Sequence, residues 1–85
     1  MDIKKLRDEI NNIDDELVSI FQNRMKIAGQ IAEYKKENRL PVSDRTRERE
    51  VLHRLTGEVS PELAVYAKSL YNTLFDLSKT YQTSI

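Results

Sequence analysis

The chain has 85 residues, so we expect one small domain spanning residues 1–85. Its 14 Lys and Arg balance its 14 Asp and Glu, and this zero net charge argues against a general nucleic-acid-binding protein, which usually carries a basic excess. The lack of cysteine excludes disulfides and thiolate metal sites, and a single histidine, His53, excludes a histidine-based metal cluster. No apolar run is long enough to span a bilayer, so we expect a soluble cytoplasmic protein with no membrane partner.

Residues 3–36 predict one long helix. They contain no proline and a single glycine, Gly29, and apolar residues recur at alternating spacings of three and four. This heptad pattern is typical of a long packed helix, and Asp2 is the expected N-cap. Arg24 interrupts the otherwise apolar series. The positions of this heptad seam are Ile3, Leu6, Ile10, Ile13, Leu17, Ile20, Arg24, Ile27, Ile31 and Tyr34.

A loop and a short helix are predicted to follow. Residues 38–43 indicate the loop, because Pro41 prevents the helix from continuing. Ser43 or Asp44 then caps a short second helix. We expect this helix to end at Gly57, a residue that tolerates the left-handed conformation.

A third helix of medium length is predicted after that. Ser60 before Pro61 is a strong start signal, and a broad apolar face continues to about Gln82. No strand pattern appears in the sequence. The expected fold is therefore all-α, with one long, one short and one medium helix in each chain.

The length of the first helix predicts a dimer. A helix of 34 residues would be roughly 51 Å long, whereas a compact domain of 85 residues is only about 30 Å across. The two shorter helices cannot cover its whole apolar stripe, so we expect an intertwined homodimer with antiparallel long helices. The alternative is a break near Gly29 that gives a four-helix monomer, but the heptad phase runs through Gly29 without a slip.

Cations on or beside the heptad seam are the most informative residues. An unpaired guanidinium at Arg24 would be costly to bury, so Arg24 must pair with a carboxylate or face a polar cavity. Arg7 and Lys35 lie beside the seam, where a solvated flank is the ordinary interpretation. Arg24 and Lys35 are about 16 Å apart along the helix and their side chains can converge, whereas Arg7 and Arg24 are about 25 Å apart. In an antiparallel dimer, Arg7 of one chain can approach Arg24 and Lys35 of the other, which suits a compact ligand with more than one carboxylate.

Polar residues on the third helix indicate the same kind of pocket. Ser78 and Gln82 are four residues apart and share an otherwise apolar face, although Gln82 could instead be frayed near the C-terminus. Arg47 and Glu48 belong to a charge run that opens the second helix, and spacing alone does not single them out. We expect His53 to be an ordinary surface or boundary residue.

Taken together, these residues resemble the all-helical class of chorismate mutase. The resemblance covers residues 3–82, and it rests on the order and separation of several short elements, each weak by itself. These elements are Leu6-Arg7-x-x-Ile10-x-x-Ile13-Asp14, Arg24, Lys35, Pro41-Val42-x-Asp44-x-x-Arg47-Glu48 and Ser78-x-x-x-Gln82.

The resemblance implies an interlocked dimer with two active sites, each shared between chains. Arg7 would come from the second chain, and Arg7 and Arg24 would hold the two carboxylates of chorismate, assisted by Arg47 and Ser78. The other site residues would come from the same chain as Arg24.

The resemblance also implies roles for the remaining site residues. Lys35 and Gln82 would contact the ether oxygen of the substrate, while Glu48 and the backbone at Asp44 would hold the ring hydroxyl. The implied reaction is the Claisen rearrangement of chorismate to prephenate, in the synthesis of phenylalanine and tyrosine, and it requires no cofactor and no metal. Two alternatives remain open: an isochorismate pyruvate-lyase, and a regulatory mutase-like module of a fused pathway enzyme.

Overall fold

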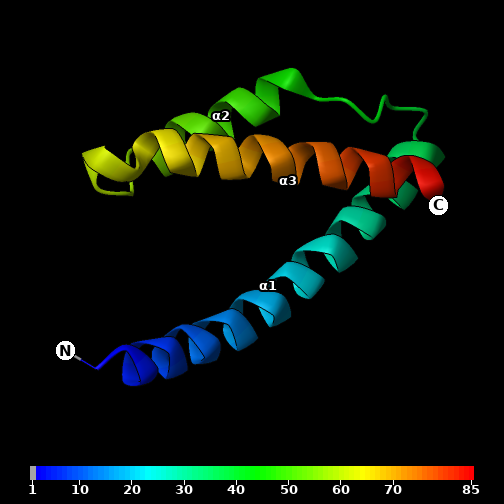
Figure 1. Ribbon diagram of the computed structural model, residues 1–85. Helices are drawn as coiled ribbons and strands as arrows, with labels where there is room; N and C mark the ends of the chain where they lie inside the picture. Colours follow the sequence, from blue (N-terminus) through cyan, green and yellow to red (C-terminus); the bar gives the residue numbers. More distant parts are fainter. Residues whose placement is uncertain (1) are drawn as a thin grey trace.

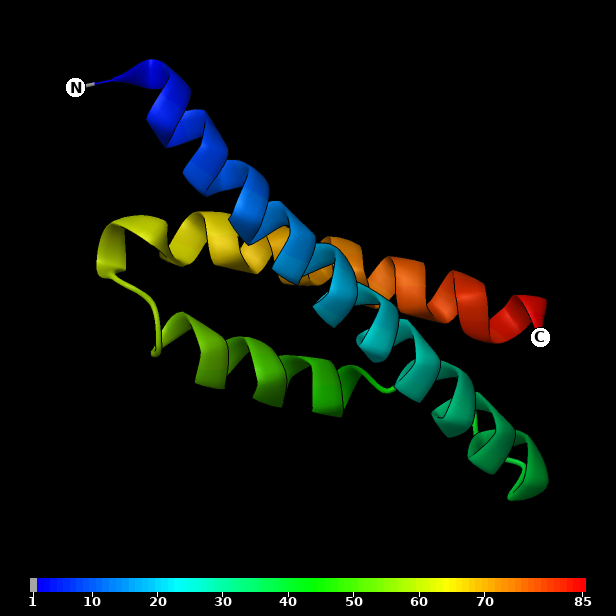
Figure 2. The ribbon, with the colours of Figure 1, turned by 90° about the horizontal axis from the view of Figure 1, so that it is seen from below.

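The computed structural model describes residues 2–85 and contains three α-helices, with no strand among these residues. This confirms the predicted all-α fold of one long, one short and one medium helix. None of the described helices is both long and apolar enough to cross a membrane. In chain order the elements are α1 (Ile3–Glu37), α2 (Arg45–Thr56), a 3₁₀ turn η1 (Pro61–Leu63) and α3 (Ala64–Ser84), shown in Figures 1 and 2.

Helix α1 is continuous over its 35 residues, about 52 Å at the usual rise. Its N-terminus is capped as predicted, since the carboxylate of Asp2 accepts a hydrogen bond from the backbone N–H of Lys4 at 2.9 Å. The helix passes through Gly29 without a break, so the four-helix alternative is wrong. Gly29 instead lies where α3 approaches closely: a Cβ there would be 3.5 Å from side-chain atoms of Tyr81 and Ile85.

The C-terminus of α1 closes in a Schellman motif. The N–H of Leu40 donates to the carbonyl of Lys35 at 2.7 Å, and the N–H of Arg39 donates to the carbonyl of Lys36 at 3.3 Å. Arg39 has φ 53°, the left-handed conformation in which glycine is usual. This turn reverses the chain into the loop that leads to α2.

Asp44, rather than Ser43, caps α2. Its side chain accepts a hydrogen bond from the backbone N–H of Arg47 at 3.0 Å. Gly57 ends the helix as predicted, but the expected left-handed conformation is wrong, since its φ is −78°. The N–H of Glu58 donates to the carbonyl of Leu55 at 3.1 Å, so the chain leaves α2 through a right-handed turn that requires no left-handed residue.

The third helix begins one turn later than Ser60-Pro61 alone indicates. Ser60 makes no side-chain cap; its carbonyl accepts the N–H of Leu63 at 2.8 Å and closes the 3₁₀ turn η1. Helix α3 then starts at Ala64 and runs to Ser84, two residues beyond the predicted end.

Helix α3 is central to the packing, because it contacts both α1 and α2. Helix α2 packs along α3, and the C-terminal half of α1 packs against α3, while its N-terminal half extends away from both (Figures 1 and 2). The buried residues are Ala28, Val51 and Phe75, one from each helix. The radius of gyration of 15.9 Å exceeds the about 12 Å expected for a compact chain of this length.

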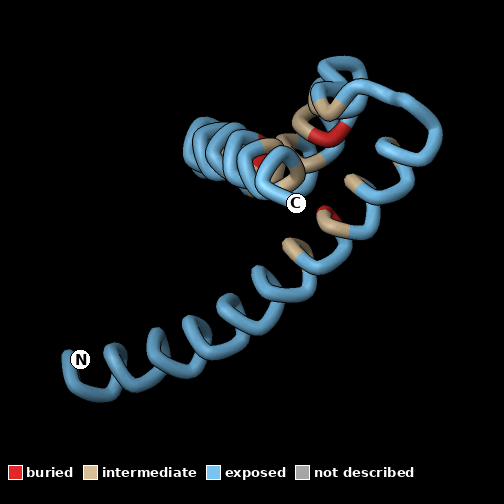
Figure 3. The backbone as a smooth tube through the Cα atoms, turned by 90° about the vertical axis from the view of Figure 1, so that its right-hand side faces the viewer, coloured by how far each residue is buried: buried red, intermediate tan, exposed pale blue. Residues whose placement is uncertain are grey.

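Most of the heptad seam is exposed in this single chain. In its N-terminal half Ile10, Ile13 and Leu17 are 56–59% exposed, and Figure 3 shows that burial begins only where α1 nears the other helices. Such a continuous apolar surface is unusual for a monomer.

Candidate functional site

Seven of the eight predicted site residues line one groove, of about 650 Å³, where α1, α2 and α3 meet. We call it the central groove. Its floor is apolar and includes the three buried residues of the core, and its polar groups come from all three helices and from the loop before α2. The seven residues are Arg24, Lys35, Asp44, Arg47, Glu48, Ser78 and Gln82.

Two hydrogen bonds connect α1 to α3 across this groove. The guanidinium of Arg24 donates to the hydroxyl of Ser78 at 2.6 Å, and the side-chain amide of Gln82 donates to the carbonyl of Ala28 at 3.0 Å. Both hydrogen bonds are partly buried. The two partners on α1, Arg24 and Ala28, are four residues apart, and so are the two partners on α3, Ser78 and Gln82. Because i and i+4 share a helical face, the two contacts set the register of α3 on α1.

These contacts bear on two of the open alternatives. Arg24 makes no ion pair among residues 2–85, so within one chain it does not belong to a buried Arg–Glu pair and instead faces the groove. Gln82 lies within α3, its side chain is half-buried, and it is hydrogen-bonded to α1. It is therefore not at a frayed end of the helix. His53 is exposed, as expected.

Lys35 brings the loop before α2 to the groove. Its ammonium group donates to the carbonyl of Val42 at 2.8 Å, and its backbone carbonyl accepts the Schellman hydrogen bond from Leu40. An ammonium group has three donors, so Lys35 can still offer hydrogen bonds to a ligand. Val42 and Asp44 line the edge of the groove next to Lys35. A pattern of side chains could not have revealed that Lys35 binds the backbone carbonyl of Val42.

Helix α2 contributes Arg47 and Glu48, which the charge run alone had not singled out. Arg47 is exposed at the edge of the groove and lies 3.8 Å from Glu50, a loose pair one turn along the helix. Glu48 points to α3 and pairs with Lys79 at 3.3 Å. Lys79 also lines the groove and was missed in the sequence, although its position three residues before Gln82 places it near the same face.

Arg7 is the one predicted site residue that lies outside the groove. It is exposed on the N-terminal part of α1, 17 residues and about 25 Å from Arg24 along a continuous helix. No movement of side chains within one chain can bring the two guanidinium groups together.

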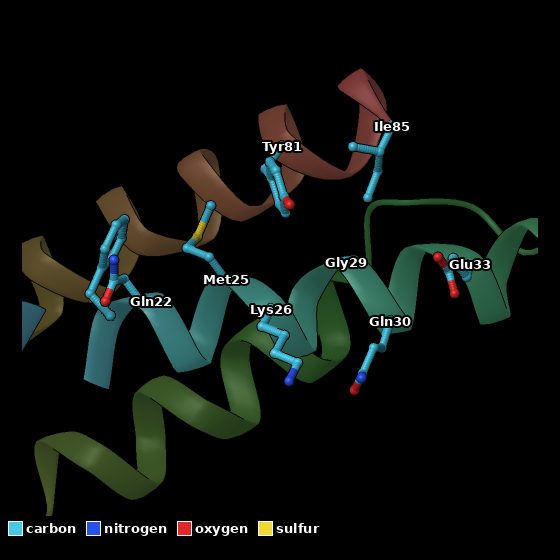
Figure 4. A pocket seen from close by; sticks show the side chains of 9 residues that line it. Gln22, Met25, Lys26, Gly29, Gln30, Glu33, Tyr81 and Ile85 are labelled. Atoms are coloured by element: carbon cyan, nitrogen blue, oxygen red, sulfur yellow. The ribbon is translucent and has the colours of Figure 1, made fainter. Parts of the chain in front are cut away.

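A second groove, of about 560 Å³, lies on another side of α1 near the C-terminus of α3. Figure 4 shows Tyr81 and Ile85 pointing from α3 toward α1 over Gly29, while Lys26 and Gln30 point away from α3. Its polar groups therefore do not converge on a common point, in contrast to those of the central groove.

Comparison with known proteins identifies the family. The family model of chorismate mutase type II matches residues 6–83, nearly the whole chain. The chain belongs to this family. The matched range includes the stretch of α1 that carries Arg7 and every residue of the central groove.

The chain is similar to two bifunctional enzymes. A bifunctional chorismate mutase/prephenate dehydratase of Buchnera aphidicola subsp. Schizaphis graminum is 42% identical over 56 residues, which are 66% of this chain and 14% of that protein. A protein with the same name from Aquifex aeolicus is 37% identical over 54 residues, 64% of this chain and 15% of its own length. The matched part is therefore about one seventh of either relative. No solved structure matches the chain significantly.

Proposed function

We propose that this protein is a chorismate mutase that converts chorismate to prephenate in the synthesis of aromatic amino acids. The observation that carries the proposal is the central groove of a chorismate mutase family member, which gathers Arg24, Lys35 and Arg47 beside two neutral hydrogen-bonding groups, Ser78 and Gln82. Guanidinium groups match carboxylates in shape and charge, so the groove suits a small dianion such as chorismate.

Arg24 is proposed to hold one carboxylate of the substrate. Its hydrogen bond to Ser78 fixes the guanidinium before the ligand arrives, which reduces the entropy lost on binding. Arg47, at the edge of the groove, and Ser78 would assist. Arg7 of the partner subunit would hold the second carboxylate.

Lys35 and Gln82 are proposed to act on the ether oxygen. In the Claisen rearrangement the ether C–O bond breaks while a new C–C bond forms within the same molecule, and negative charge grows on that oxygen in the transition state. Each residue already makes one hydrogen bond within the chain and keeps a further N–H to donate. A preorganised donor of this kind typically contributes about 3–4 kcal/mol to the stability of a transition state.

Glu48 and the backbone at Asp44 are proposed to hold the ring hydroxyl. The carboxylate of Glu48 can accept a hydrogen bond from this hydroxyl, and both residues lie on the rim formed by the start of α2. Together with the carboxylate contacts, this would hold the enolpyruvyl arm over the ring, and such orientation is a large part of catalysis for a unimolecular step.

We further propose that the active unit is an isologous dimer in which each site takes Arg7 from the partner. The support is the exposed heptad seam, because burying a Leu or Ile side chain contributes about 1.5–3 kcal/mol and α2 and α3 leave the N-terminal half of α1 uncovered. Antiparallel packing about an axis near the middle of α1 would carry Arg7 of the partner subunit toward the half that holds Arg24 and Lys35. The cytoplasmic location expected from the sequence stays a prediction.

One experiment separates this proposal from its alternatives. The purified protein is incubated with chorismate and, separately, with isochorismate, and the products are identified by NMR. Formation of prephenate from chorismate supports the mutase. Release of pyruvate from isochorismate with no prephenate would support the lyase, and no turnover of either compound, with binding retained, would support a regulatory module.

A further inference from the structure

The pair formed by Lys79 and Glu48 is unlike every other ion pair in residues 2–85. It is the only one that joins two helices, α3 and α2; the others connect residues three or four positions apart. It is also the least exposed, with side chains 32% and 25% accessible. An ion pair that is partly shielded from water and bridges two elements constrains geometry more than an exposed pair within one helix.

The position of this pair gives it a functional meaning. Lys79 and Glu48 both line the central groove, and Lys79 lies on α3 between Ser78 and Gln82, two residues that bind α1. Asp76, at 3.9 Å, is the other carboxylate near the ammonium group, but it is 79% exposed and lies outside the groove. The shorter contact, at 3.3 Å, is the one directed to Glu48.

A carboxylate in this groove raises an electrostatic problem. The groove is proposed to bind a dianion, and the negative charge of Glu48 repels both substrate carboxylates. A free glutamate side chain would also sample several rotamers, and a rotamer-rich side chain costs about 0.5–1.5 kcal/mol to immobilise on binding. An ammonium group held against it reduces both costs.

We infer that Lys79 is a positioning residue for substrate binding. Resting on the proposed function, its role is to hold the Glu48 carboxylate as an acceptor for the ring hydroxyl and to offset the repulsion between Glu48 and the dianion. Lys79 acts through Glu48 and does not itself touch the reacting atoms. Because the hydroxyl contact is made equally in the bound substrate and in the transition state, its loss changes KM rather than kcat.

The test compares steady-state kinetics of the Lys79→Met variant with the parent. We expect KM for chorismate to rise about twofold to fivefold, the range of a partly exposed charge contact, with kcat within about twofold. Lys79→Arg, which keeps the charge, should restore most of the KM. Lys79→Gln provides a second neutral variant should methionine impair folding, which circular dichroism and the oligomeric mass report.

Lys68→Met is the matched control. Lys68 is exposed on α3, eleven residues before Lys79, which places it on nearly the same helical face about 16 Å away. The Lys68→Met substitution removes the same charge from the same helix, at a position outside the groove. We expect the KM of Lys68→Met to equal that of the parent. A rise of KM in this control would instead indicate a general effect of net charge on binding of the dianion.

A double-mutant cycle identifies the route by which Lys79 acts. In a Glu48→Gln background, Lys79→Met should cause little further rise in KM, since the carboxylate to be positioned is gone. An equal rise in both backgrounds would mean that Lys79 contacts the substrate directly, and an unchanged KM in Lys79→Met itself would mean that it has no role; either result overturns the inference.

A measurement without turnover distinguishes failure of this inference from failure of the proposed function. The ¹³C resonance of the Glu48 side-chain carboxyl should move in Lys79→Met and stay in place in Lys68→Met. If the parent makes no prephenate, the proposed function falls, while an unmoved Glu48 resonance in Lys79→Met refutes the positioning contact by itself.

Discussion

Arg7 and Arg24 provide the sharpest test of a site shared between two chains. They are separated by 17 residues of continuous helix, about 25 Å, and two arginine side chains together cannot span that distance to reach one compact ligand. A bidentate arginine–carboxylate contact involves two charge-assisted hydrogen bonds of about 1.5–3 kcal/mol each. Arg7→Ala and Arg24→Ala should therefore each lose about two decades or more of kcat/KM.

Mixing the two variant chains should restore activity in a predictable amount. In a heterodimer one site would take Arg24 from the first chain and Arg7 of the partner subunit, both intact, and the other site would lack both. Random exchange makes half of the dimers heterodimers, each with one of its two sites complete, so about one quarter of the parent activity per chain is expected for a two-fold dimer.

The assay is chorismate loss after the chains are unfolded together and refolded, with heterodimers counted by native mass spectrometry. A mixture of Arg24→Ala with Lys35→Ala is the matched control, because both residues would serve a site from the same chain and no combination gives a complete site. Activity that stays at the level of the single variants, once exchange is demonstrated, would refute the shared site.

Three further outcomes are expected. Arg24→Ala should lose activity but keep its fold by circular dichroism, because among residues 2–85 the side chain of Arg24 hydrogen-bonds only to the hydroxyl of Ser78; joint loss of folding and activity would argue for a structural role. Gln82→Glu should be nearly inactive at neutral pH and recover as the pH falls, since an ionised glutamate cannot donate to the ether oxygen, whereas the O–H of the protonated acid can; a pH–rate profile of kcat/KM that coincides with that of the parent would remove Gln82 from the site. Arg39→Gly should raise the free energy of unfolding by about 0.5–1 kcal/mol in urea titration, because glycine adopts the left-handed conformation without the cost that arginine bears there; an unchanged or lower value would show that the strain is absent.

The sequence by itself determined the helices and most of the polar residues of the groove. Caps such as Asp2 and Asp44 act within three residues of their own position, and the heptad pattern repeats every few residues, so both can be recognised locally. Arg24 on the seam and the i, i+4 pair Ser78 and Gln82 were conspicuous because polar side chains on an apolar stripe need a reason to be there. The resemblance to the family then indicated Asp44 and the α2 residues.

Only the tertiary structure decided which groups meet. Lys79 and Glu48 are 31 residues apart and come together because α2 and α3 pack side by side, an approach set by many side chains at once rather than by any local spacing. The carbonyls of Val42 and Ala28 became partners of Lys35 and Gln82 for the same reason, and a backbone carbonyl leaves no trace in a pattern of side chains. The periodicity of a helix fixes which face is apolar, but not what covers it, because packing angle and distance depend on residues remote in the chain.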